Sequence, residues 1–139
     1  MIKKISLIVI IALLSSVALI AQNKQAVIAF YNLENLFDTI DDPKTWDEQF
    51  LPDGDYQWNT QRYLKKLDNM ATVISRIAKS QGNITMLGVS EIENELVLRD
   101  LVAHPKLKPL NLDIAHYDSP DRRGVDVALL YCKDRFRVY

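Results

Sequence analysis

The chain has 139 residues, 48% of them hydrophobic, which is enough for one domain with a sizeable core. Its 17 basic and 18 acidic residues nearly cancel, and this balance excludes binding of nucleic acid through bulk positive charge. An anionic substrate would therefore need local basic residues or a metal ion. Cys132 is the single cysteine, so an internal disulfide is excluded and the core must hold the fold.

The first 21 residues have the layout of a secretory signal peptide. Lys3 and Lys4 precede residues 5–20, which are apolar apart from three serines, and the small Ala21 is followed by polar residues. We expect cleavage after Ala21, a secreted or periplasmic mature protein, and no stable membrane association after cleavage. The alternative is an uncleaved anchor, because the apolar run approaches the ~18 residues of a membrane span.

The mature part begins with a pattern of strand, loop and helix. Residues 26–31 form an apolar run that predicts a buried strand, and residues 32–38 predict a strand exit or a short helical turn. Residues 39–59 are rich in Asp, Pro, Gly and aromatic side chains, which predicts a long ordered loop. We expect the aromatic side chains of this loop to pack against the fold rather than to line a substrate cleft.

The strongest helix signal follows this loop. Thr60 is a suitable N-cap, and apolar residues then recur at helical spacing as far as Gln81. The outer face of this helix carries four basic residues, and the pattern there indicates a solvated surface: Arg62, Lys65, Lys66 and Arg76.

The order of elements predicts a layered α/β or α+β fold. The chain ends inside its last predicted strand, so we expect residues 22–139 to be the N-terminal part of a larger domain. The remaining predicted elements are a buried strand at 84–90, a helix at 94–103 ended by His104-Pro105, strands at 112–117 and 125–131, a turn at Lys133-Asp134 and the start of another strand.

Two polar side chains follow the first two predicted strands. Asn32 comes directly after residues 26–31, and Glu91 follows residues 84–90. Ligands gather at the carboxyl ends of strands in open α/β sheets. An amide oxygen and a carboxylate there suit Mg²⁺, which binds oxygen ligands and keeps water for its remaining positions. Spacing alone equally allows Asn32 to cap the turn that follows it and Glu91 to cap the next helix.

Three segments around these residues resemble a known family: Phe30–Phe37, Gly88–Asn94 and Asp118–Tyr131. They resemble the endonuclease/exonuclease/phosphatase superfamily, the DNase I-like metal-dependent phosphoesterases. The resemblance implies a four-layer α/β sandwich around two packed sheets, incomplete in this chain. It also implies that Asn32 and Glu91 bind the catalytic metal, Mg²⁺ or alternatively Mn²⁺. The implied substrates are phosphodiesters or phosphomonoesters in nucleic acids, phosphoinositides, sphingomyelin or small molecules.

The sequence departs from the family pattern. The family has an Asp-x-Asn pair and a terminal Asp-His pair in its second half, and neither occurs in this chain. Without them the site lacks a general base and part of the stabilisation of the transition state. We therefore keep two hypotheses, a phosphodiester hydrolase with half of its active site missing here, and a non-catalytic binding module or inactive fragment of the same fold. His104 and His116 are poor substitutes for the missing histidine.

Arg123 is the candidate catalytic residue for phosphate contact, because a guanidinium can bind phosphate through two hydrogen bonds. The alternative is a solvated turn in which an arginine pairs with Asp118 or Asp121. Asp126 interrupts an apolar strand, and an unpaired buried carboxylate is costly. We expect Asp126 to pair with an arginine or to lie at the rim of the site.

Overall fold

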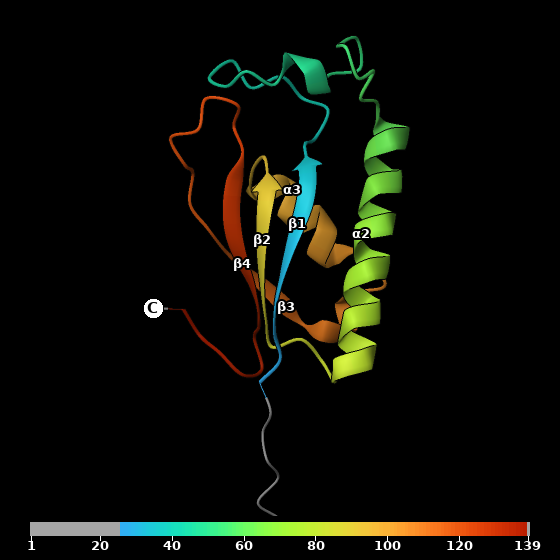
Figure 1. Cartoon of the computed structure of the whole chain (residues 1–139), viewed down its shortest axis with the longest axis vertical. Coiled ribbons are helices and arrows are strands. Elements are labelled where there is room, and N and C mark those ends of the chain that lie inside the picture. Colours follow the sequence, from blue (N-terminus) through green and yellow to red (C-terminus); the bar gives the residue numbers. More distant parts are fainter. Residues whose placement is uncertain (1–25, 139) are drawn as a thin grey trace, which may run out of the picture.

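A computed structural model describes residues 26–138, which form one mixed four-stranded sheet and two α-helices (Figure 1). The predicted signal peptide lies outside the described residues. Two short 3₁₀ helices, η1 (Glu48–Phe50) and η2 (Lys108–Leu110), lie in connections. The prediction of an α/β fold is confirmed. The main elements are β1 (Ile28–Leu36), α2 (Thr60–Gln81), β2 (Met86–Ile92), α3 (Glu95–Ala103), β3 (Leu112–His116) and β4 (Asp126–Cys132).

The strand order is β1-β2-β4-β3. β1 and β2 are parallel, as expected for a strand–helix–strand unit, and β4 is antiparallel to both of its neighbours. The carboxyl ends of β1 and β2 therefore lie side by side, under the segment that joins β1 to α2 (Figure 1). The site hypothesis requires this arrangement.

Both helices begin at an asparagine. The Asn59 side chain accepts a hydrogen bond from the Arg62 N–H, so Asn59, and not Thr60 as predicted, is the N-cap of α2. Asn94 accepts in the same way from Val97 N–H at the start of α3. The helix α2 ends at Gln81 and is capped by Gly82, whose φ of 76° suits glycine. No helix in the described part of the chain is both long and apolar enough to span a bilayer.

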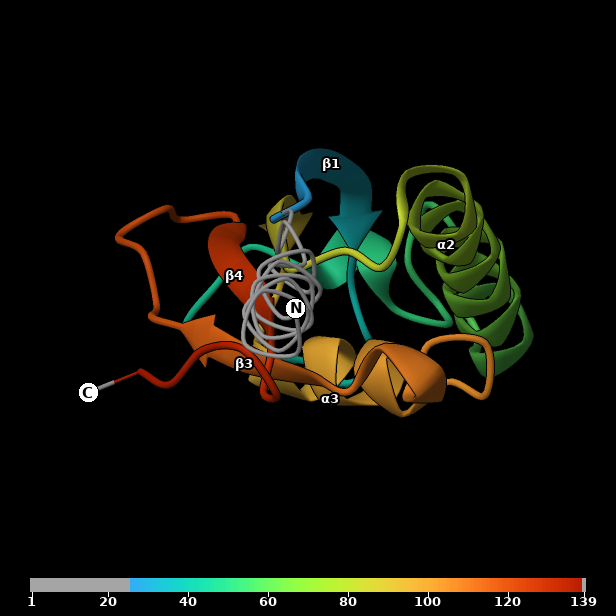
Figure 2. The same cartoon turned by 90° about the horizontal axis from the view of Figure 1, so that it is seen from below.

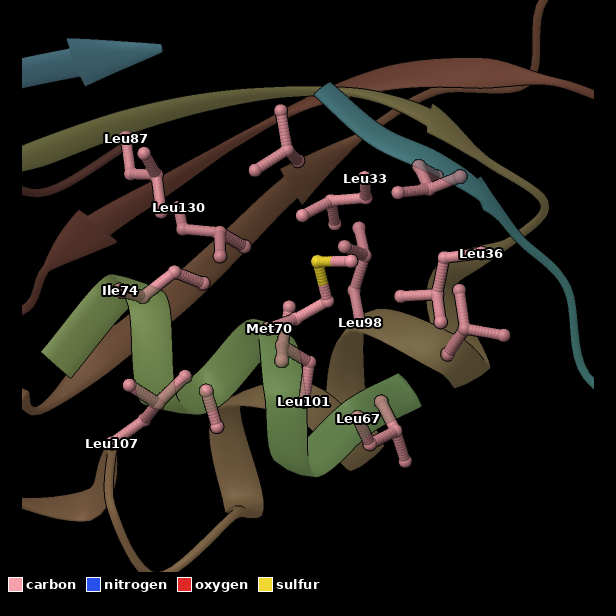
Figure 3. Close-up of a cluster of buried hydrophobic side chains, with 14 of the residues drawn as sticks. Leu33, Leu36, Leu67, Met70, Ile74, Leu87, Leu98, Leu101, Leu107 and Leu130 are labelled. Carbon is pink, nitrogen blue, oxygen red and sulfur yellow. The ribbon is translucent and has the colours of Figure 1, made fainter. Parts of the chain in front are cut away.

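α2 and α3 lie on the same side of the sheet and cover one of its faces (Figure 2). Leucine, isoleucine and methionine side chains from both helices fill the space against β2 and β4, and burial of each such side chain stabilises the fold by about 1.5–3 kcal/mol. Figure 3 shows this core, which includes Leu33, Leu67, Met70, Ile74, Leu87, Leu98, Leu101 and Leu130.

The opposite face of the sheet, which we call the bare face, is apolar and uncovered in the described structure. Phe30 of β1 is 85% exposed, and Val127 of β4 is 68% exposed. The Phe30 ring lies across Gly88 of β2, where an added Cβ would come within 2.4 Å of the ring. Residues 26–31 were predicted to be buried, and this is wrong for the side chains on the bare face. Apolar composition alone could not show that only one face is covered.

The long loop is ordered by its aromatic residues, as predicted. Phe50 stacks on Phe37 with ring centroids 4.0 Å apart, and Trp58 donates its indole N–H to the Phe37 carbonyl at 2.9 Å. At the other end of the chain, residues 133–135 form the predicted turn, but residues 136–138 form no strand.

Candidate functional site

Asn32 and Glu91 meet where the regular pairing between β1 and β2 ends, four residues before the last residue of β1 and one residue before the last residue of β2. In the parallel ladder Asn32 pairs with Ser90, so the next residue of β2 reaches the same edge of the sheet. The Asn32 side-chain amide donates a hydrogen bond from Nδ2 to Glu91 Oε1 at 2.9 Å. Asn32 is exposed and Glu91 is half-buried. The prediction that these two residues lie together agrees with the structure. The predicted strand exit or helical turn is wrong for residues 32–36, because β1 continues through Asn32 to Leu36.

The backbone around this pair has an unusual conformation. Glu91 is the extra residue of a bulge in β2, because Ser90 pairs with Val127 and Ile92 pairs with Asp126. Its φ is +56°, in the left-handed region that costs a residue with a Cβ about 1–2 kcal/mol. The bulge turns the Glu91 side chain out of the strand's alternation and toward Asn32. Backbone strain of this kind concentrates at functional sites.

A matching irregularity lies in β1. Glu34 and Asn35 have φ values of 52° and 59°, and the β1–β2 register shifts between Asn32 and Leu36. Asn32 Oδ1 accepts a hydrogen bond from Glu34 N–H at 2.6 Å, which holds this turn. Asn32 therefore does stabilise the turn that follows it. An amide oxygen has two lone pairs, so this hydrogen bond leaves Oδ1 able to bind a cation as well.

The capping alternative for Glu91 is wrong. Asn94 caps α3, and among the described residues the Glu91 carboxylate accepts no hydrogen bond except the one from Asn32. An exposed amide and a half-buried carboxylate at adjacent strand ends have the donor chemistry that a hard divalent cation requires.

Lys66 of α2 brings a positive charge to the same edge. Its Nζ donates a hydrogen bond to the Glu34 carbonyl. Burial lowers the pKa of Lys66, while the negative charges of Glu34 and Glu91 act in the opposite direction. The sequence pattern indicated a solvated face at Lys66 and did not predict this contact. Helical periodicity gives the face of the helix but does not show that its first turns lie beside the end of β1.

Arg123 forms an ion pair with Asp121, with Nη2 and Oδ2 2.9 Å apart, and the Arg123 side chain is 68% exposed. This is the pairing that the sequence analysis weighed as the alternative to phosphate contact. The Asp121 carboxylate raises the pKa of Arg123, and Glu91 contributes in the same direction. Arg123 thus lies within electrostatic range of Glu91 while it is bonded to Asp121.

Asp126 pairs with a histidine and not with an arginine. His116 Nε2 lies 2.7 Å from Asp126 Oδ2, and Ser119 N–H donates to Asp126 Oδ1 at 2.8 Å. The two side chains are 4% and 5% exposed, so the carboxylate is buried but satisfied. His116, Asp118 and Asp126 also offer ligand atoms within 4.8 Å of one another, which makes them a second candidate metal group.

The buried carboxylate of Glu93 supports the backbone beside the site. Glu93 Oε2 accepts a hydrogen bond from Asp38 N–H at 2.6 Å, and Asn94 Nδ2 donates to Asp38 Oδ2 at 3.1 Å. Burial, followed by the nearby negative charge of Asp38, raises the pKa of Glu93 to about 8, although the Asp38 N–H opposes the rise. These bonds join the exit of β1 to the start of α3. The sequence pattern did not predict this role of Glu93.

Each of the two histidines lies beside an aspartate. His104 Nε2 lies 3.4 Å from Asp68 on the helix side of the molecule, and His116 is buried against Asp126. The described chain thus contains the two predicted metal ligands and none of the missing pairs.

The comparisons with known proteins identify a family for this chain. The model of the Endonuclease/Exonuclease/phosphatase family matches residues 27–139, which is most of the chain. No curated protein and no solved structure matches it. The matched residues include Asn32, Glu91 and the segment from Asp118 to Tyr131. The chain therefore belongs to the endonuclease/exonuclease/phosphatase family.

Proposed function

We propose that this chain carries the metal-binding part of a Mg²⁺-dependent phosphoesterase that hydrolyses phosphodiester bonds in the manner of an endonuclease or exonuclease. The family implies a phosphoesterase hydrolase acting on phosphoesters. One observation carries the finer proposal. Asn32 Nδ2 and Glu91 Oε1 lie 2.9 Å apart where the β1–β2 pairing ends, and a bulge with positive φ holds Glu91 in this position.

In this proposal Asn32 and Glu91 hold Mg²⁺, which Mn²⁺ can replace. When bound, the metal would supply polarisation of a phosphoryl oxygen and stabilisation of the leaving oxygen. Glu91 supplies the negative charge that fixes the cation, and the Asn32 amide oxygen supplies a neutral ligand that leaves the cation a net positive charge for the substrate. Arg123 would bind the phosphate after its guanidinium leaves Asp121, which its exposure permits.

The same proposal covers the rest of the protein. The apolar bare face supports a four-layer sandwich in which a second sheet packs on Phe30 and Val127, with residues 22–139 as the N-terminal part of the domain. A signal peptide at residues 1–21 and a secreted or periplasmic location complete the proposal, on the layout of the sequence alone.

The metal site is tested by titrating the isotopically labelled chain with Mn²⁺ and recording which backbone amide signals broaden in NMR spectra. We expect broadening at residues 32–34 and 90–92, and its loss in Glu91→Gln. Glu48→Gln removes an equal charge from an exposed position in η1 and should leave the broadening unchanged. Broadening centred on residues 116–119 and 126, insensitive to Glu91→Gln, would assign the metal to the His116 group instead.

A second candidate function is a non-catalytic binding module of the same fold. The absence of the Asp-x-Asn and Asp-His pairs favours it for the chain as given. We expect the purified 139-residue chain to bind Mg²⁺ yet to show negligible hydrolysis of DNA or bis-p-nitrophenyl phosphate. A robust Mg²⁺-dependent rate that disappears in Glu91→Gln would instead establish catalysis by this chain.

A further inference from the structure

A groove of about 760 Å³ runs along the first turns of α2, and we call it the α2 groove. It reaches Glu34, which follows Asn32 by two residues, so one end of the groove adjoins the candidate metal site. In Figure 1 the start of α2 lies at the same end of the molecule as the carboxyl end of β1. The residues that matter for its chemistry are Glu34, Trp58, Arg62, Leu64, Lys65 and Lys66.

The charges in the α2 groove oppose the usual preference of a helix N-terminus. The first turn of α2 contains no acidic residue and contains Arg62, and Lys65 and Lys66 follow in the next turn. The positive end of the helix dipole disfavours such cations by some tenths of a kcal/mol each. α3, by contrast, has Glu95 in its first turn. An anion bound in the groove would turn this unfavourable arrangement into a favourable one.

The same cations have no carboxylate partners. Arg99, Lys106 and Arg123 each form an ion pair with an aspartate or glutamate. Within residues 26–138, Arg62, Lys65 and Lys66 have no carboxylate oxygen within 4.0 Å. These cations therefore form no direct ion pair, although Glu34 and Glu91 act on the charge of Lys66 and Asp68 acts on that of Lys65 from a longer distance.

Two of them are held in place by neutral groups. Arg62 donates to the Tyr56 carbonyl and lies 5.6 Å from the centre of the Trp58 ring. Lys66 donates to the Glu34 carbonyl and lies 5.6 Å from the same ring. Carbonyl oxygens and an aromatic face fix the position of a cation without cancelling its charge. The groove therefore presents ordered positive charge beside the metal site.

We propose that the α2 groove binds the sugar–phosphate backbone of a nucleic-acid strand whose reacting phosphate lies at Asn32 and Glu91. This inference rests on the proposed function and names its substrate class. Arg62 and Lys66 are on the order of 6 Å apart along the helix axis, from a rise of 1.5 Å per residue, so they extend away from the metal site. A small phosphoester ends at the metal, whereas a strand carries further phosphates into the groove.

A membrane surface fits the groove less well. A surface that binds lipid presents several large apolar side chains beside its cations. Among these lining residues Leu64 is a strongly exposed large apolar side chain, whereas Trp58 is 8% exposed and lies beneath the cations. The overall charge of the chain is nearly balanced, so binding to a strand would have to come from such a local cluster.

The test measures the fluorescence anisotropy of a labelled single-stranded oligonucleotide with the 139-residue chain in EDTA, over a range of salt concentrations. Arg62→Gln with Lys65→Gln should weaken binding at least about fivefold and reduce the slope of log K against log salt by about 1.4, since each phosphate contact on a single strand contributes about 0.7. Lys65→Gln alone, which touches no backbone carbonyl, should show about half of that change in slope.

Arg76→Gln with Lys79→Gln is the matched control. These residues have the same spacing on the same helix, are exposed, and lie fourteen residues further on, nearly four turns away on almost the same face. The control should bind as the wild type does. Equal losses in both double variants would show binding by net charge, and unchanged binding in the groove variants would show no groove contact. Either result overturns the proposal.

Two further measurements distinguish nucleic-acid binding from lipid binding, and a failure of the groove from a failure of the metal site. Vesicles of phosphatidylcholine with a phosphoinositide should not compete for the oligonucleotide site, and binding to vesicles without binding to oligonucleotide would overturn the proposal in favour of a lipid surface. Glu91→Gln should abolish Mn²⁺ binding and should not weaken oligonucleotide binding in EDTA, because it removes a negative charge from beside the proposed strand. A failure of the metal site and a failure of the groove are therefore read from different measurements.

Discussion

Two polar pairs lie at the same end of the sheet and differ in almost every physical respect. Asn32 and Glu91 are accessible, their pairing depends on a residue with positive φ, and the carboxylate has a single described hydrogen bond. His116 and Asp126 are almost fully buried, and both oxygens of Asp126 are hydrogen-bonded. Both pairs connect through the β2–β4 ladder, where Asp126 is the partner of Ile92.

The difference indicates different roles. A buried carboxylate must be satisfied by the protein itself, and Asp126 is satisfied by a histidine and a backbone N–H from the loop before β4. The Asn32–Glu91 pair stabilises the fold little, because water can replace its hydrogen bond, and the backbone at Glu91 costs free energy. A strained, accessible and under-satisfied pair is suited to a ligand, whereas a buried and satisfied pair is suited to holding a loop.

The largest effect that tests this comparison is expected at the buried pair. Asp126→Ala would leave His116 and the Ser119 N–H without partners in a buried environment and should lower the free energy of unfolding by about 3 kcal/mol. Glu91→Ala should change it by less than about 0.5 kcal/mol. Urea denaturation followed by circular dichroism measures both. A loss at Glu91 as large as that at Asp126 would show that the accessible pair is structural after all.

The order of elements was predictable from the sequence, and the coverage of the sheet was not. Helical periodicity in residues 60–81 and the apolar runs around β1, β2 and β4 gave the elements in their correct order. The same apolar runs predicted burial on both faces, because composition does not tell which face a helix covers. Phe30 and Val127 are therefore exposed where burial was expected.

The accessible pair was predictable, and the buried pair was not. Asn32 and Glu91 stand out because each follows an apolar run directly, and strand ends meet at one edge. His116 and Asp126 are ten residues apart with a turn between them, and no spacing rule brings them together. The signal that could have found them is the charge of Asp126 inside an apolar strand, which requires a partner from a neighbouring strand.

A smaller effect of the opposite sign is expected from Glu91→Gly. Glycine adopts positive φ without the steric cost that glutamate meets at φ +56°, so this variant should be more stable than Glu91→Ala by about 0.5–1 kcal/mol. It should also lose the stabilisation by Mg²⁺, which for the wild type is about 1.4 kcal/mol at ten times the dissociation constant.

Thermal unfolding of wild type, Glu91→Ala and Glu91→Gly, each with Mg²⁺ and with EDTA, separates the backbone strain at position 91 from the stabilisation by the metal. A gain in stability together with a loss of metal response would show that β2 retains the strained glutamate for binding. If Glu91→Gly were no more stable than Glu91→Ala, the backbone at this position would carry no strain.

The smallest effect on stability is expected at Arg123. It is exposed and paired with Asp121, and such surface ion pairs contribute about 0–1 kcal/mol. Arg123→Gln should therefore change the free energy of unfolding by less than about 0.5 kcal/mol.

If Arg123 binds phosphate beside the metal, the same variant should weaken the binding of inorganic phosphate in the presence of Mg²⁺, measured by calorimetry. Arg99→Gln, which removes an equally exposed arginine from an ion pair on α3, should not. If both variants weakened phosphate binding equally, Arg123 would have no specific role in binding phosphate. Ligand binding at this end of the sheet would then rest on Asn32 and Glu91.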